Sequence, residues 1–273
     1  MSAALKVVRA LRQPSLIGGF IRRQIKSNYL WPYWFRVLTS ALLPPYVRTS
    51  RFRSLYVLTY GRSGSTLLTG YLSMLPGIRL RGENYLFPLP LAEADDRLRQ
   101  LSNLSYGGRD KTASPWYGSQ LVSYARWRRD MRQAVLNQLY PRQPFPRTLG
   151  FKEIRWWYRL PADRFDSILG WLVELFPPGG IVVLTRDLDK VMAGAWWKEL
   201  TQEERDHQRV QLEAFEKRAL AYVAQHPEHA HAVTYEEFTG DPTAARALTE
   251  FLGLRFDEKT WRKALDQQFS YKS

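Results

Sequence analysis

The sequence predicts an α/β fold in which helices flank a central parallel β-sheet. Two short, continuous apolar runs, LYVLT at 55–59 and IVVLT at 181–185, are typical of strands buried on both faces of such a sheet. Each run is followed by a polar loop and then by apolar residues at helical spacing. Strands that alternate with helices along a chain form parallel sheets.

The segment around the first strand has clear boundaries. After 55–59, a helix is expected from about Ser65 to Leu75, because Pro76-Gly77 is a helix stop signal. The next apolar residues, IRL at 78–80, are expected to form a second strand.

The middle of the chain is expected to hold an insert and a third strand. Residues 88–115 are polar and are expected to form an irregular, mobile lid, and 115–140 are expected to form a long basic helix. The alternating segment 148–156 predicts a strand, and the apolar spacing of 163–176 predicts an amphipathic helix.

The last third repeats the strand–helix order after 181–185. Thr201 with Glu204 three residues later forms a capping box, which predicts the start of a helix. Residues 231–238, HAVTYEEF, are expected to form a further strand. Asp241 at the N-cap and Pro242 at the first helical position then predict another helix.

The predicted organisation is a basic helical segment at 1–50 followed by one domain at 51–273, with a helical insert at about 88–147. The N-terminal segment is expected either to pack on the domain or to contact an anionic membrane peripherally. The best apolar stretch, 37–47, is too short to span a bilayer and contains Pro44-Pro45. A secretory signal pattern is lacking, so we expect a cytoplasmic protein.

The positive charge is concentrated at the N-terminal end. The net charge is +14, and residues 1–82 hold 13 Lys and Arg residues before Glu83, the first acidic residue. An anionic partner should therefore meet this part of the chain, and nucleic acid, an acidic membrane face and a phosphorylated cofactor all fit this charge. The chain has no cysteine, which excludes disulfides, thiolate metal sites and cysteine nucleophiles.

The loop YGRSGST at 60–66 has the composition of an anion-binding site. Its glycines let the backbone approach a ligand, the helix that follows presents free N–H groups, and hydroxyl and guanidinium groups add donors. These residues are Gly61, Arg62, Ser63, Gly64, Ser65 and Thr66. The lysine of a nucleoside-triphosphate P-loop is missing, because Ser65 follows Gly64, and the dinucleotide pattern GxGxxG is incomplete. The loop therefore suits a phosphate or phosphosulfate bound without a metal.

Four motifs in order resemble the sulfotransferases that use 3′-phosphoadenosine 5′-phosphosulfate (PAPS), and their pattern is most similar to the carbohydrate and tyrosylprotein branches. They are YGRSGSTLLTGYLSMLPGIRLRGENY, GFKEIR, IVVLTRDLDKVMAG and VTYEEFTGDPTAARALTEFLGL, which extend from 55 to about 256. The resemblance implies the P-loop-like sulfotransferase fold and PAPS as the donor, without a metal.

The resemblance also implies roles for individual residues in donor binding. Residues 62–66 would bind the 5′-phosphosulfate, Arg186 the 3′-phosphate, and Tyr235 would lie near the adenine. The family usually has a serine eight residues after the arginine, but this chain has Gly194. Either a backbone N–H or another side chain such as Lys190 is expected to replace it.

Two further residues match the catalytic positions of the family. Glu83, in the family's GE position, would be the general base that removes the proton of the acceptor hydroxyl, with arginines such as Arg81 nearby. Lys152, in GFKEIR, would neutralise charge on the bridging or transferred oxygens, and Arg155 is a candidate for acceptor binding.

The acceptor is expected to be the hydroxyl, or the amine, of a saccharide or small metabolite, and no nucleic-acid partner is expected. The alternatives are a P-loop nucleotide kinase and a non-catalytic relative that binds anions or membranes. The histidines of HPEHAH at 226–231 have loose spacing, and we expect a solvated turn there rather than a metal site.

Overall fold

The structure is a computed structural model that describes residues 50–103, 110–140 and 148–267. The basic segment expected at 1–50 lies outside these residues, apart from Ser50. The chain divides into two compact units, Met1–Val47 with Tyr140–Phe145 and Arg48–Leu139 with Pro146–Ser273. All the elements described below belong to the second unit.

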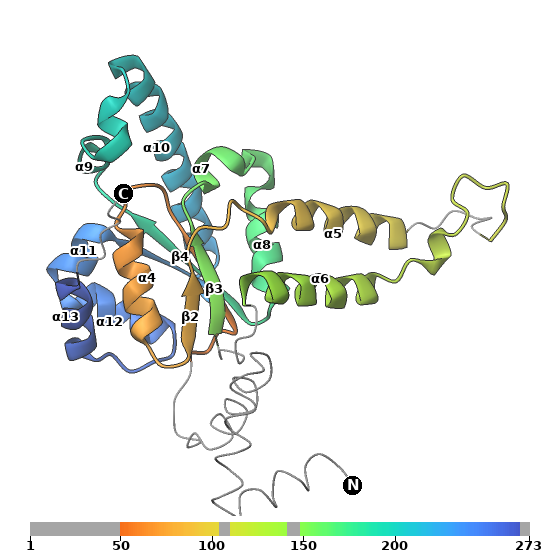
Figure 1. Ribbon diagram of the computed structural model, residues 1–273, viewed down its shortest axis with the longest axis horizontal. Helices are drawn as coiled ribbons and strands as arrows, with labels where there is room; N and C mark the ends of the chain where they lie inside the picture. The colour runs from red at the N-terminus through yellow and green to blue at the C-terminus, as the bar shows by residue number, and fades with distance from the viewer. Residues whose placement is uncertain (1–49, 104–109, 141–147, 268–273) are drawn as a thin grey trace, which may run out of the picture. The chain divides into compact units, whose positions relative to one another are not determined.

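The second unit is built on a five-stranded, all-parallel sheet with the strand order β2-β3-β1-β4-β5 (Figure 1). Its strands are β1 (Ser54–Leu58), β2 (Ile78–Arg81), β3 (Thr148–Glu153), β4 (Gly179–Thr185) and β5 (Ala230–Thr234). The strand β1 is central: Leu55 lies opposite Gly150 of β3 on one side and Gly180 of β4 on the other. This arrangement confirms the predicted fold class.

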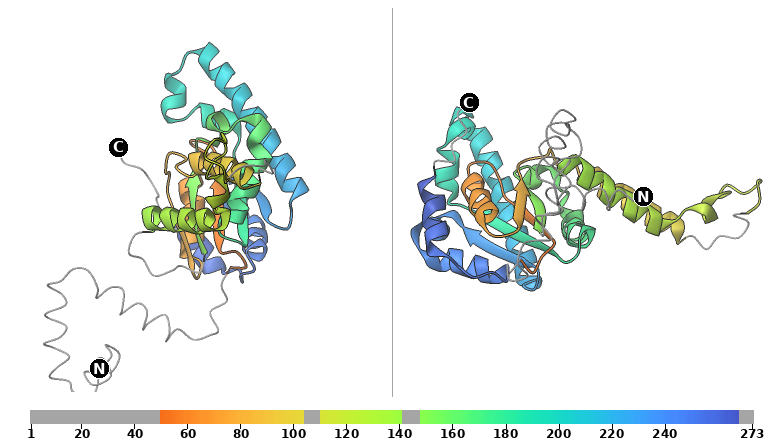
Figure 2. Two further views of the ribbon diagram at one scale, coloured as in Figure 1. Left: turned by 90° about the vertical axis from the view of Figure 1, so that its right-hand side faces the viewer. Right: turned by 60° about the horizontal axis from the view of Figure 1, so that its bottom comes forward.

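Helices cover both faces of the sheet (Figures 1 and 2). Leu55 and Leu58 of β1 point to opposite faces of the sheet. Both are completely buried because a helical layer covers each face. One face packs on α8 (Phe165–Leu175) and α10 (Gln202–Gln225). The other packs on α4 (Ser65–Met74), α11 (Tyr235–Gly240), α12 (Pro242–Phe251) and α13 (Glu258–Asp266).

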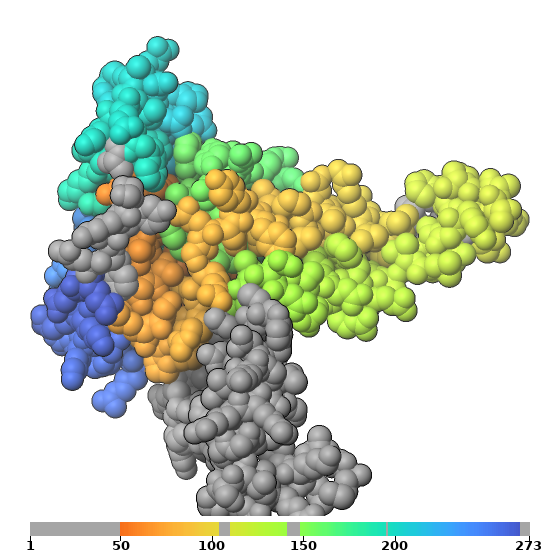
Figure 3. Space-filling view, viewed as in Figure 1, coloured from red at the N-terminus to blue at the C-terminus, as the bar shows by residue number. Residues whose placement is uncertain are grey.

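The region after β2 is more ordered than the sequence predicted. Residues 88–115 were expected to be an irregular lid, but they contain the helix α5 (Leu89–Ser102). Pairs at helical spacing, Glu93–Arg97 and Asp96–Arg99, line its exposed side. The long basic helix expected at 115–140 is a short 3₁₀ turn, η1 (Ser119–Leu121), followed by α6 (Tyr124–Leu139). Figure 3 shows the side chains of α5 and α6 in contact.

Helix boundaries elsewhere follow local capping chemistry. The Thr201 hydroxyl accepts from the Glu204 N–H and the Glu204 carboxylate accepts from the Thr201 N–H, so the predicted capping box starts α10. The Asp241 carboxylate accepts from the Thr243 N–H at 2.6 Å, which confirms the predicted start of α12. The strand expected at 231–238 is wrong in its second half, because Thr234 caps α11 and ends β5.

Short helical turns complete the connections. They are α7 (Trp156–Arg159) and η2 (Ala162–Arg164) after β3, and α9 (Leu188–Met192) and η3 (Ala195–Glu199) after β4. Within the described residues, no helix has both the length and the apolar content needed to cross a membrane.

Candidate functional site

The predicted site residues gather at one edge of the sheet. Because all five strands are parallel, their carboxyl ends meet at this edge, and the chain turns to opposite sides of β1 there. The loop after β1 holds residues 59–64, Glu83 follows β2, Lys152 lies near the end of β3, Arg186 follows β4 and Tyr235 follows β5. Residues far apart in the sequence therefore share one edge of the sheet.

The loop between β1 and α4 is tightly curled. Arg62 and Gly64 both have positive φ, 68° and 86°, which fits the close turn into α4. No side chain caps the start of α4, so its first N–H groups are available to a ligand. The Ser63 hydroxyl does not face this space: it is buried 2.7 Å from the Thr59 hydroxyl oxygen, which lies 2.8 Å from the Leu184 carbonyl oxygen. Ser63 braces the loop through its side chain and offers only its backbone to an anion.

Two aromatic rings require glycine at 61 and 64. A Cβ atom on Gly64 would lie 2.1 Å from Cδ2 of Tyr235, and one on Gly61 would lie 2.4 Å from Cζ2 of Trp196. Neither contact is sterically allowed. Tyr235 was expected near the donor, whereas the contact of Trp196 with Gly61 was not predicted, because nothing local in the sequence relates Trp196 to a loop 135 residues earlier.

Glu83 and Lys152 form an ion pair at the centre of the site. Glu83 Oε1 lies 2.7 Å from Lys152 Nζ, and the same ammonium lies 3.5 Å from the Ser65 hydroxyl at the start of α4. Lys152 is mostly buried, while the Glu83 side chain is 31% exposed. A carboxylate that solvent or substrate can reach thus lies beside a cation that also contacts the anion-binding loop.

Arg155 and Glu153 hold Glu83 in place. Arg155 Nη1 lies 3.0 Å from Glu83 Oε2 and 2.7 Å from Glu153 Oε1. Glu153 is completely buried, and its Oε2 accepts from the N–H groups of Asn84 and Leu86 at 3.0 and 3.1 Å. The guanidinium of Arg155 also stacks on Tyr85, 4.1 Å from the ring centre. Arg155 therefore fixes the position of the Glu83 carboxylate.

Arg81 was expected to lie near Glu83, but Lys152 and Arg155 are the cations that contact it. The Arg81 Nε–H donates to the Leu139 carbonyl at 2.8 Å. Sequence proximity suggested Arg81, but an alternating strand followed by a turn directs successive side chains to different places.

Arg186 is fixed by its backbone and by its guanidinium. The Tyr60 hydroxyl accepts from the Arg186 N–H at 2.8 Å and also forms a short hydrogen bond with Glu216 of α10. The Arg186 Nη1 donates to the Arg62 carbonyl at 2.8 Å, and its guanidinium stacks 4.3 Å from the Tyr235 ring centre. Its Nε is buried and has no hydrogen-bond partner among the described residues, so a donor remains for an anion.

Tyr60 and Glu216 form a buried pair that the sequence did not reveal. Burial raises the pKa of the Glu216 carboxyl, and burial together with the hydrogen bond to Glu216 raises the pKa of Tyr60. The two residues are 156 positions apart, and Glu216 belongs to none of the motifs, although Tyr60 begins the anion-binding loop. Their contact fixes α10 to the start of the loop after β4.

The two candidates to replace the missing serine at 194, a backbone N–H and the Lys190 side chain, differ in what they contact. The Gly194 N–H donates to the Val191 carbonyl at 3.0 Å and is therefore occupied. Lys190 is exposed, with its Nζ 3.6 Å from Glu236 Oε1, on the side of Arg186. Lys190 is thus better placed to meet an anion.

A histidine cluster lies at the other end of the sheet. His226, Glu228 and His229 bring potential ligand atoms within 4.8 Å of one another just before β5. Glu228 Oε1 lies 2.7 Å from His229 Nδ1, and Tyr222 bonds the other ring nitrogen at 3.0 Å. The expectation of a solvated turn, rather than a metal site, remains a prediction.

Comparison with known proteins relates this site to a family. The chain matches the model of the sulfotransferase family over residues 55–258. None of the curated proteins matches the chain.

Solved structures with similar folds include several sulfotransferases. The sulfotransferase domain of the Synechococcus PCC 7002 olefin synthase has a TM-score of 0.50 at 21% identity, over 80% of this chain and 77% of that one. A sulfotransferase from Alicyclobacillus acidocaldarius has a TM-score of 0.44 at 16% identity, over 73% and 80%. Retinol dehydratase in complex with androsterone and the inactive cofactor PAP has a TM-score of 0.37 at 15% identity, over 78% and 63%.

The family match begins at β1 and reaches the start of α13, so it includes all five strands and every predicted site residue. We conclude that the chain belongs to the sulfotransferase family.

Proposed function

We propose that the protein transfers the sulfuryl group of PAPS to a hydroxyl of a saccharide or small metabolite, with Glu83 as the general base. The observation that carries this proposal is the contact between Glu83 and Lys152, 2.7 Å apart beside the start of α4. A carboxylate at this position can accept the proton of the acceptor hydroxyl, and an ammonium can stabilise negative charge on the departing bridging oxygen.

The residues after β1 would bind the 5′-phosphosulfate of the donor. The N–H groups at the start of α4 and the side chains of Arg62, Ser65 and Thr66 provide donors, and the positive end of the helix dipole supports an anion there. The buried contacts of Ser63 and the rings against Gly61 and Gly64 keep this loop in shape. Preformed donors of this kind stabilise developing charge without reorganisation.

The 3′-phosphate would lie between β4 and β5. Arg186 Nε makes no hydrogen bond among the described residues and lies 3.9 Å from Glu236 Oε1, and Lys190 adds a second cation from α9. Tyr235 supports Arg186 by stacking and packs on Gly64, so it connects the two phosphate-binding regions. A nucleotide that carries both a 5′ and a 3′ anion suits this separation of cations.

The proposed reaction is an in-line displacement at sulfur. Glu83 accepts the proton of the acceptor hydroxyl while that oxygen forms a bond to sulfur, and the bond between sulfur and the bridging phosphate oxygen breaks. The products are the sulfate ester and 3′-phosphoadenosine 5′-phosphate (PAP), whose phosphate keeps the electron pair. Lys152, between Ser65 and Glu83, is placed to stabilise charge on the departing oxygen.

Labelled PAPS and a panel of acceptor hydroxyl compounds would test this function. We expect Glu83→Gln to lower kcat by about 10²–10⁴-fold, because general base catalysis typically contributes this much. PAP affinity measured by calorimetry should persist in this variant. Glu93→Gln, at an exposed glutamate of α5 that pairs with Arg97, is the matched control and should keep its activity.

Two results would contradict the proposal. Transfer by Glu83→Gln at the wild-type rate would remove Glu83 from the chemistry. Failure of the wild-type protein to bind PAP would show that PAPS is not the donor.

A further inference from the structure

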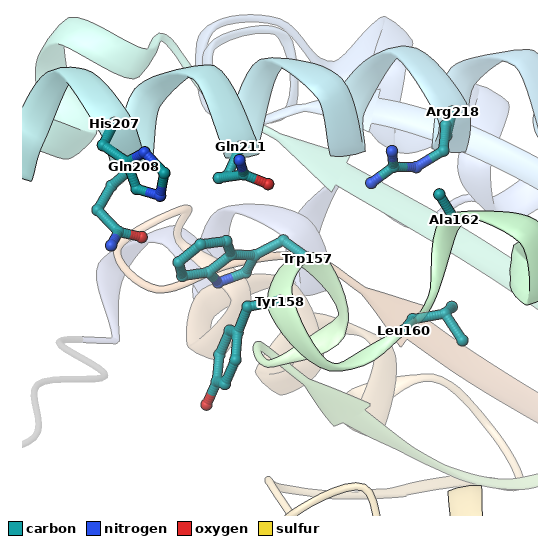
Figure 4. Close-up of a pocket in the computed structure, with 8 residues that line it drawn as sticks. All are labelled: Trp157, Tyr158, Leu160, Ala162, His207, Gln208, Gln211 and Arg218. Carbon is teal, nitrogen blue, oxygen red and sulfur yellow. The ribbon is translucent and has the colours of Figure 1, made fainter.

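A groove between Trp157 and α10 contains none of the residues of the proposed donor site. It has a volume of about 620 Å³, within the range typical of small-ligand sites. Figure 4 shows that α7 and η2 form one wall and that the long helix α10 forms the other. The lining residues are Trp157, Tyr158, Leu160, Ala162, His207, Gln208, Gln211 and Arg218.

We propose that this groove binds the acceptor and that the acceptor is a saccharide carrying an anionic group. That the bound saccharide is the acceptor rests on the proposed function. That the groove binds an anionic saccharide rests on the residues of the groove alone. The anionic group would meet Arg218 at one end, and the saccharide would lie along Trp157 and Gln208 towards the other.

The groove is connected to the proposed catalytic centre by sequence and by packing. Tyr158 lies three residues after Arg155, which contacts Glu83 at 3.0 Å. Trp157 packs on Trp197 with ring centres 6.0 Å apart, and Trp197 packs on Trp196 at 6.1 Å. Trp196 in turn covers Gly61 of the anion-binding loop. Contacts between three tryptophans therefore connect the groove with the anion-binding loop.

Two buried polar atoms in the groove lack partners. Gln208 Oε1 can only accept a hydrogen bond and Arg218 Nε can only donate one, and neither has a partner among the described residues. Unpaired buried polar groups cost free energy, so a ligand that supplies both partners gains affinity. Gln208 requires a donor such as a sugar hydroxyl, and Arg218 requires an acceptor such as a carboxylate or sulfate oxygen.

The charge of Arg218 favours an anionic ligand over a neutral one. It has no acidic partner within 4.0 Å among the described residues, and it lies over Phe165 at 5.9 Å from the ring centre. The two other arginines of the helix have partners outside the groove: Arg209 contacts Asp189 and Glu213, and Arg205 donates to the Leu200 carbonyl at 2.6 Å. A guanidinium facing a groove without a counter-ion is suited to bind one.

The length and lining of the groove favour a saccharide over a compact phenol. From Gln208 to Arg218 the helix backbone rises about 15 Å at roughly 1.5 Å per residue, so the groove between these two residues extends over more than the width of one small ring. Figure 4 shows the Trp157 and Tyr158 rings near the Gln208 end, and flat aromatic faces of this kind can stack on sugar rings. Amide and imidazole groups beside them suit several hydroxyls.

The test compares two disaccharides that differ in one group. The probe is glucuronic acid linked to N-acetylglucosamine, and the control is the same disaccharide with its carboxylate reduced to an alcohol. Calorimetry on the full chain without donor should show roughly tenfold to hundredfold tighter binding of the acid form, the range for a hydrogen bond to a charged group.

Three variants locate the binding. Arg218→Gln should remove the preference for the acid form, and Gln208→Leu should weaken both disaccharides while the preference persists. Arg209→Gln, on the same helix but paired outside the groove, should change neither affinity. Thermal unfolding of each variant checks that the chain folds.

Equal wild-type affinity for the two disaccharides, absence of binding at millimolar concentration, or a preference that survives Arg218→Gln would each overturn the inference. PAP binding is measured separately. If PAP binds and the acid disaccharide does not, only the groove assignment fails. If the disaccharide binds and PAP does not, the groove assignment as a saccharide site holds and the proposed transfer from PAPS fails.

Discussion

Lys190 illustrates how a single departure from a family pattern can be compensated. The serine expected at 194 is a glycine, and the N–H of that glycine already donates to Val191. Lys190 lies one helical turn earlier on α9 and faces Glu236 beside Arg186. We infer that its ammonium takes over the 3′-phosphate contact.

Lys190→Ala should weaken PAP binding roughly fivefold to tenfold, since solvent screens an exposed cation. Its effect on adenosine 5′-monophosphate, which lacks the 3′-phosphate, should be negligible. Calorimetry with both nucleotides measures the difference, and Lys198→Ala on η3 is the control. An equal loss for both nucleotides would show that Lys190 does not contact the 3′-phosphate.

Gly194→Ser should restore the missing contact and tighten PAP binding. The backbone at 194 has φ −109° and ψ 147°, which any residue adopts, and a Cβ there would have only ordinary van der Waals neighbours. One neighbour is Arg62 Nε at 3.7 Å, so the new hydroxyl would point into the proposed nucleotide site. Weaker binding of PAP by this variant would contradict the proposed location of the 3′-phosphate.

At the scale of elements, a buried aspartate joins three helices. Asp95 of α5 is 2% exposed and accepts hydrogen bonds from Trp127 Nε1 and Arg128 Nη1 of α6, at 2.8 and 2.6 Å. It also accepts from the Tyr124 hydroxyl at 2.9 Å and from Trp171 Nε1 of α8 at 3.0 Å. Four donors converge on one carboxylate, which explains how polar helices can be held together with few apolar contacts.

Asp95→Asn should lower the free energy of unfolding by about 3 kcal/mol, because it removes the buried counter-ion of the Arg128 guanidinium and leaves only the exposed Glu174 at 3.7 Å. Urea unfolding measures the change. Asp96→Asn, at the adjacent exposed residue that pairs with Arg99, is the matched control and should have little effect. Equal stability of the two variants would show that the cluster around Asp95 is not important for folding.

The same cluster explains which elements the sequence predicted poorly. Strands such as β1 and β4 were predicted because every residue in them is buried and apolar patterns are visible locally. Helix α5 was missed because it packs through Ala92 and a buried charge, which a hydrophobic pattern does not detect. The helical start at Tyr235 was missed because the preceding strand extends to Thr234 without a break in pattern.

For the whole molecule, the sheet topology determines what sequence reasoning can find at the site. Glu83 and Arg186 follow predicted strands, and Lys152 lies within one that ends earlier than predicted, at Glu153, so the parallel sheet brings all three to one edge. Trp196, Glu216 and Glu153 act through tertiary contacts, and their positions depend on side-chain packing between elements. That these residues share one edge was predictable, whereas the residues that hold them in place were not.

Global stability should depend on pH through two histidines near β5. Burial lowers the pKa of His231, which stacks on Phe251 while Arg51 lies over the same ring, and burial also lowers the pKa of His229. Below about pH 6.5 the unfolded chain takes up protons that the folded chain does not, so stability falls as the pH decreases.

Urea unfolding between about pH 7.5 and 5.5 should show this fall, a range in which most carboxylates stay ionised. His231→Phe keeps the aromatic stacking on Phe251 and removes one titrating group, so it should have a flatter profile than the wild type. An unchanged profile in this variant would show that His231 does not contribute to the pH dependence.

The strand order also determines when a newly made chain can acquire its site. β1 leaves the ribosome long before β4, its partner on one side, because Ser54 pairs with Gly179, 125 residues later. At translation rates of about 5–20 residues per second, the wait lasts roughly 6–25 s. During that interval a strand whose residues are all buried in the finished fold has no neighbour on that side, and the nascent polypeptide must be kept from associating with others until the centre of its sheet is complete.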